Sequence, residues 1–135
     1  MTIDLLANIT RTLAPDADPD GPDTRAALLF AAEIAMTAAA AEPDDADHWT
    51  FAGLAVRESV DRLTEDLTDD LILSIEPSQL TLPGAAEARE PTRALVASLA
   101  DFYASAALRE TSQPWRRLAW ASVAQHLDRA VQELS

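Results

Sequence analysis

The chain contains no cysteine and no lysine, and all ten of its basic residues are arginine. The absence of cysteine excludes disulfides, thiolate metal sites and a cysteine nucleophile. No basic region precedes an apolar run at the N-terminus, so we expect no signal peptide and a cytoplasmic location.

Positive charge is also scarce. The 135 residues include 23 acids and ten arginines, a net charge of -13. Residues 1–70 carry 16 acids and four arginines, whereas residues 71–135 carry seven acids and six arginines. A field of this sign repels phosphate backbones, which disfavours nucleic acid as a partner. The 28 alanines, together with arginine in place of lysine, are typical of a GC-rich bacterial composition.

Apolar residues make up 48% of the chain, enough to form a hydrophobic core. A chain of this mass buries roughly two thirds of the surface that its unfolded form exposes, which suffices for one core. The sequence therefore predicts a single domain over residues 1–135.

Apolar residues recur at steps of three and four along most of the chain, which is the helical pattern. The prediction is an all-α antiparallel bundle of four main helices plus a short N-terminal helix. Residues 71–84 are expected to be irregular or to form a small hairpin, two alternatives that the short apolar runs leave open. The predicted helices cover residues 3–13, 24–42, 43 to about 69, about 90–106 and 114–135, with Pro91 in the first turn of the fourth. A separate short helix over residues 85–89 is an alternative start to this region.

The helix predicted over residues 24–42 is unusually rich in alanine. Ala27, Ala31, Ala35 and Ala38 fall within a narrow arc, so another helix can approach closely along them. Glu33 lies near the middle of this apolar run, which argues against a membrane span.

The segment before that helix places Asp16, Asp18 and Asp20 at alternate positions, followed by Gly21. This pattern resembles the first half of an EF-hand calcium loop, and the resemblance implies a site for Ca²⁺. It departs from the family where the bidentate glutamate is expected, because Ala27 stands there. The alternative is a solvated turn that caps the next helix.

A second acidic pattern lies on the third predicted helix, where Glu58, Asp61, Glu65 and Asp69 recur at steps of three and four. The Glu-x-x-Asp spacing is loosely similar to that of the all-helical nucleotide pyrophosphatases, and the similarity implies Mg²⁺ binding. The stripe lies opposite the apolar stripe of the same helix, so we expect these carboxylates to face solvent.

Three ionisable residues are candidates for a pocket inside the bundle: Glu33, His48 and His126. His48 follows Asp44 and Asp45 at helical spacing, which suggests a contact between carboxylate and histidine. A histidine at the edge of a bundle helix is similar to the histidine phosphotransfer domains, which implies phosphoryl transfer at His126. Arg129 and Ala130 here replace a lysine and a glycine of that family. The alternative is a histidine hydrogen-bonded to a neighbour.

Large apolar residues off the core stripes suggest a contact surface. Tryptophan beside arginine is typical of interface hot spots. The alternative is that the first helix or residues 71–84 cover them. We predict a non-enzymatic helical protein–protein interaction module, with a homodimer as one form of it; the alternative is a small metal- or ligand-binding helical protein or enzyme. The predicted contact residues are Phe51, Leu54, Trp115, Arg116, Arg117 and Leu118.

Overall fold

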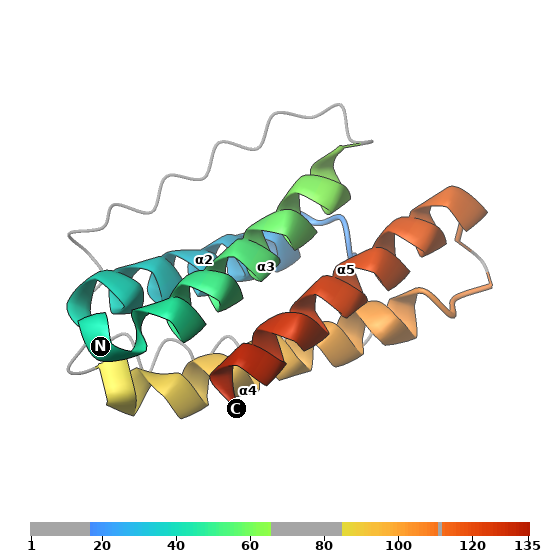
Figure 1. The fold of residues 1–135 in the computed structure, drawn as a ribbon. Coiled ribbons are helices and arrows are strands. Elements are labelled where there is room, and N and C mark those ends of the chain that lie inside the picture. The colour runs from blue at the N-terminus through green and yellow to red at the C-terminus, as the bar shows by residue number, and fades with distance from the viewer. Residues whose placement is uncertain (1–16, 66–84, 111) are drawn as a thin grey trace.

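The computed structural model describes residues 17–65, 85–110 and 112–135, and every regular element in these ranges is helical. This confirms the predicted all-α bundle for the four main helices (Figure 1). The helix predicted over residues 3–13 and the segment 71–84 lie outside the described residues. The elements are α2 (Pro22–Ala41), the short 3-10 helix η1 (Pro43–Asp45), α3 (Ala46–Thr64), α4 (Ala85–Ala106) and α5 (Pro114–Leu134).

The four helices pack in the spatial order α2, α3, α5, α4, and a smaller contact between α2 and α4 closes the bundle (Figure 1). Two contacts show that α3 and α5 are antiparallel. His48 at the start of α3 lies beside Glu133 at the end of α5. Arg116 at the start of α5 donates a hydrogen bond to the backbone carbonyl of Leu63 at the end of α3.

Proline marks the first turn of α2 and of α5, where its missing N–H leaves no hydrogen bond unmade. The prediction that Pro91 begins the fourth helix is wrong, because α4 starts at Ala85 and continues through Pro91. Proline at this position removes a donor to the carbonyl of Glu87. Glu87 is exposed, so water can reach that carbonyl and the helix tolerates the loss.

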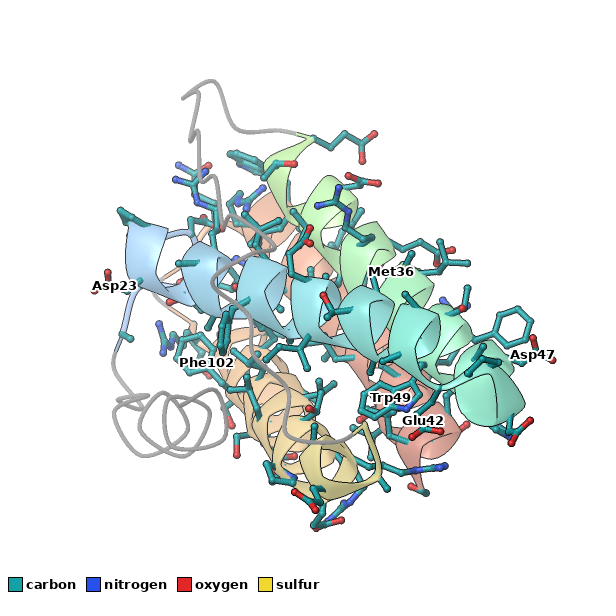
Figure 2. The ribbon with its side chains drawn as sticks, turned by 90° about the vertical axis from the view of Figure 1, so that its left-hand side faces the viewer. Asp23, Met36, Glu42, Asp47, Trp49 and Phe102 are labelled. Atoms are coloured by element: carbon teal, nitrogen blue, oxygen red, sulfur yellow. The ribbon has the colours of Figure 1, made fainter. Side chains whose placement is uncertain are left out.

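The predicted alanine seam of α2 is confirmed, since all four of its alanines are buried. At this interface Gly53 of α3 faces Met36 of α2, which is labelled in Figure 2. A Cβ atom on Gly53 would lie 2.8 Å from the Met36 sulfur and 3.4 Å from the Cβ atom of Ala35. Small residues on both helices therefore allow the two backbones to approach closely.

All four helices contribute to one hydrophobic core. By length and composition α2 alone, among the described helices, could span a membrane, yet more than half of its apolar window is buried inside the bundle. Glu33 is half-buried on this helix. The largest fully buried side chains include Trp49, Tyr103, Leu28, Ile34, Leu63, Leu95, Leu99 and Leu127.

Candidate functional site

The side chains of Arg116 and Trp120, both buried, meet at the carboxylate of Asp20, just before α2. The side chain of Arg116 is 7% exposed, and its Nε atom donates to Asp20 Oδ2 at 3.0 Å. Its Nη2 atom donates to Asp20 Oδ1 and, at 3.1 Å, to the carbonyl of Leu63. Trp120 Nε1 also donates to Asp20 Oδ1, at 3.0 Å. One carboxylate thus joins the chain before α2 to α5 and, through Arg116, to the end of α3.

The backbone on either side of Asp20 is held by further hydrogen bonds. The Tyr103 hydroxyl of α4 donates to the carbonyl of Pro19 at 2.7 Å, and Arg109 Nη1 donates to the carbonyl of Ala17 at 3.2 Å. Burial raises the pKa of the Tyr103 phenol well above its usual range, and the negative charge of Asp20 adds to this effect. We use the name anchor for residues 17–21 together with the side chains that donate hydrogen bonds to them, which are Tyr103, Arg109, Arg116 and Trp120.

Two of the three aspartates predicted to bind Ca²⁺, Asp18 and Asp20, instead form hydrogen bonds within the anchor. The Asp20 carboxylate is engaged by Arg116 and Trp120, and Asp18 Oδ1 accepts the backbone N–H of Asp20 at 2.9 Å. Asp16 lies outside the described residues. Within the described parts of the chain, no group of three or more histidine, aspartate or glutamate side chains is placed to hold a metal ion. Asp18 and Asp20 therefore serve a turn and an ion pair.

The prediction that Arg116 and Arg117 lie on an exposed contact surface is wrong, because neither side chain is fully exposed. Arg116 is buried, because it precedes Trp120 by four residues and so shares the buried stripe of α5. Arg117 is half-buried, and its Nε atom donates to the carbonyl of Ala107 at 2.8 Å, which ties α5 to the chain after α4.

The two histidines lie along the junction of α3 and α5, each beside one carboxylate. Nδ1 of His48 is 3.1 Å from Oε2 of Glu133, where the sequence suggested Asp44 or Asp45. Nδ1 of His126 is 3.2 Å from Oε2 of Glu58, and the guanidinium of Arg129 contacts both side chains.

The residues proposed for a pocket are not brought together. The carboxylate partner of His126 lies ten residues along α3 from His48, which corresponds to about 15 Å of helix. Glu33 belongs to α2, and no hydrogen bond or ion pair joins it to either histidine in the described structure.

The acidic stripe of α3 faces solvent, as predicted. Glu58, Asp61 and Glu65 are exposed, and Glu65 pairs with Arg62 at 3.7 Å. Asp69 lies outside the described residues, so the part of the stripe that the structure describes is a charged, hydrated helix face.

Four of the predicted contact residues are large, apolar and exposed: Phe51 by 55%, Leu54 by 47%, Trp115 by 48% and Leu118 by 69%. The predicted alternative cover, residues 3–13 or 71–84, lies outside the described residues.

Helical periodicity places these four residues on one side of the bundle. Phe51 precedes Glu58 by seven residues on α3, so both lie on one stripe. On α5, Trp115 precedes His126, and Leu118 precedes Arg129, by 11 residues, which is also close to a whole number of turns. Contacts between Glu58, His126 and Arg129 join the stripes of the two helices.

The joined stripes form a surface that we call the α3–α5 face. Its centre is charged, and an apolar pair lies at each end. The face comprises Phe51, Leu54, Glu58, Trp115, Leu118, His126 and Arg129.

Over the residues that the structure describes, the helices and their packing define the class of this protein, an all-α antiparallel bundle in which four helices share one core. Comparison with family models, curated proteins and solved structures finds no match.

Proposed function

We propose that this chain is a non-enzymatic protein–protein interaction module that binds its partner through the α3–α5 face. The observation that carries the proposal is the exposure of two aromatic and two leucine side chains on one side of the bundle. Scattered apolar residues are ordinary on a protein surface, whereas apolar residues gathered on one face mark contact sites.

The composition of the face suits a contact surface. Each apolar pair combines an aromatic ring with a leucine, and aromatic side chains are enriched at interfaces relative to the rest of a protein surface. Between the pairs, the side chains of Glu58 and Arg129 are 55% and 59% exposed and remain hydrated in the free chain. A partner can therefore bury the apolar pairs and form charged hydrogen bonds between them.

The buried polar groups support this reading over an enzyme with an internal pocket. Arg116 and Trp120 each donate a hydrogen bond to the Asp20 carboxylate, and the Tyr103 hydroxyl donates one to the carbonyl of Pro19. These contacts hold the anchor against the bundle. The histidines that could serve a reaction are separated along the surface, each beside its own carboxylate.

Photo-crosslinking in the native host tests the proposal. A benzoylphenylalanine introduced at Leu118 on the face should yield a specific covalent adduct after irradiation. The matched control carries the same group at Ala104, which is exposed on α4 and outside the face. Absence of an adduct at position 118, or equal adducts at both positions, would contradict a contact role for this face. An adduct with another copy or with a different protein supports the proposal.

A further inference from the structure

We infer that the partner on the α3–α5 face is a second copy of this chain, related to the first by a two-fold axis through the centre of the face. This inference rests on the proposed function and names the partner. It follows from the way in which the two ends of the face match and from the charges between them.

The two ends carry equivalent apolar pairs. Phe51 and Leu54 are three residues apart on α3, and Trp115 and Leu118 are three residues apart on α5, so each pair projects an aromatic ring and a leucine from adjacent turns. The first pair lies in the N-terminal half of α3, whereas the second lies beside the C-terminal end of α3, where Arg116 contacts Leu63. Nine residues separate Leu54 from Leu63, which is about 14 Å along the helix.

A two-fold axis through the centre exchanges these ends. Phe51 and Leu54 of one protomer then meet the partner's Trp115 and the partner's Leu118, and the same contact occurs twice. All four apolar residues of the face then become covered by apolar residues of the partner, whereas the exposed Met36 and Leu108 lie outside the face. A heterologous contact would leave one apolar pair of each chain exposed or would lead to an open chain of molecules.

The centre of the face is complementary to itself. Glu58 is negative on α3 and Arg129 is positive on α5, and their closest nitrogen and oxygen atoms are 3.8 Å apart within one chain. Because these two charged groups adjoin at the centre of the face, both lie near the axis, where each approaches both charges of the partner and can pair with the opposite one. A centre of one sign would repel its own copy, whereas alternating signs favour it.

The net charge of -13 predicts how salt affects this association. Two strongly acidic chains repel each other over several ångströms of solvent, and salt screens that repulsion. Self-association should therefore tighten as ionic strength rises. Binding of a basic protein by the acidic chain should instead weaken, so salt separates the two kinds of partner.

Complementation between two variants tests the exchanged ends. One variant carries Phe51→Ser and Leu54→Ser, and the other carries Trp115→Ser and Leu118→Ser. In either variant's own dimer both contacts join an altered pair to an intact pair, so dimerisation should weaken by at least ~100-fold. In an equal mixture, one of the two contacts joins two intact pairs, so the mixed dimer should bind more tightly than either variant binds itself.

Sedimentation equilibrium of the purified 135-residue chain, with a fluorescent label on one variant, measures these affinities. Met36→Gln is the matched control, because Met36 is 42% exposed and packs at Gly53, on the α2 side of α3. It should leave dimerisation unchanged. Circular dichroism verifies each fold, and Leu118→Ser alone provides the same test if Trp115→Ser disturbs α5.

Each outcome has a distinct meaning. If the mixed dimer binds no more tightly than either variant binds itself, the two-fold exchange of ends is wrong. A wild-type chain that stays monomeric at about 1 mM, a concentration at which even contacts of only ~4 kcal/mol are populated, overturns the second copy as partner. If the chain is monomeric but photo-crosslinking at position 118 yields an adduct with a different protein, the proposed function still holds and only the second copy is excluded. If no adduct forms either, both the proposed function and the second copy as partner are contradicted.

Discussion

Raising the pH above 10 should destabilise this protein through Tyr103, the single tyrosine in the chain. Its side chain is fully buried, and its hydroxyl donates to the carbonyl of Pro19 at 2.7 Å. Burial raises the pKa of this phenol first, and the charge of Asp20 raises it further, against the opposing effect of Arg25 and Arg116. The folded protein therefore keeps the proton that the hydrogen bond requires.

The direction of the effect follows from proton binding. In the unfolded chain the phenol ionises near pH 10, whereas in the folded chain it stays protonated well above that pH. The contribution to stability is therefore complete below about pH 10 and is lost as the pH rises, because the unfolded state then binds fewer protons. The free energy of unfolding should fall by ~1.4 kcal/mol per pH unit, or ~2.7 kcal/mol by pH 12. The chain has no lysine or cysteine that would titrate in the same range.

Urea unfolding between pH 8 and pH 12, followed by circular dichroism, measures this slope. Tyr103→Phe should lose about 1–2 kcal/mol at pH 8, because the buried carbonyl of Pro19 loses its donor. The variant should lack the alkaline slope, so its stability should overtake that of the wild type near pH ~11. A slope that persists in Tyr103→Phe, or tyrosinate absorbance from the folded protein near pH 10, would refute the reasoning.

Two further substitutions test the anchor and the interface between α2 and α3. Asp20→Asn should lower the free energy of unfolding by about 3–5 kcal/mol in urea, because it leaves the buried Arg116 guanidinium without its counter-charge. Adding Arg116→Met should recover much of that loss, and a decrease below about 1 kcal/mol in the single variant would contradict the role of the pair. Gly53→Ala should raise the melting temperature, because alanine favours the helix by ~0.5–1 kcal/mol, the tightest contact of the new Cβ atom is with the movable side chain of Met36, and its 3.4 Å separation from the Cβ atom of Ala35 is an ordinary contact. A lower melting temperature would show that Met36 cannot move aside.

The helical architecture could be predicted because its signal is local. The apolar stripe of α3, with Trp49, Val56 and Leu63, recurs at steps of three and four, and all three side chains are buried. The alanine seam of α2 was equally visible, since small residues at helical spacing permit close packing whichever helix faces them. Pro91 misled the prediction of α4, because a proline inside a helix is tolerated where the carbonyl it leaves without a donor is hydrated.

The anchor could not be predicted in the same way, because its partners are distant along the chain. Arg116 lies 96 residues after Asp20, and no local pattern pairs them. A usable signal did exist, since Arg116 lies four residues before Trp120 and seven before Val123, on the buried stripe of α5. A cation on such a stripe requires a carboxylate, and the aspartates before α2 were candidates. The partners of His48 and His126 depended likewise on which helices became neighbours.

The anchor also constrains the order in which the molecule can be completed. Its hydrogen bonds span 84 residues between Tyr103 and Pro19 and 100 residues between Trp120 and Asp20. During synthesis the Asp20 carboxylate has neither Arg116 nor Trp120 as a partner until α5 has left the ribosome, so its pairing is a late event with a large loop-closure entropy. Loss of α5 by truncation or proteolysis would therefore deprive Asp20 of Arg116 and Trp120, although these residues are about 100 residues away in the sequence.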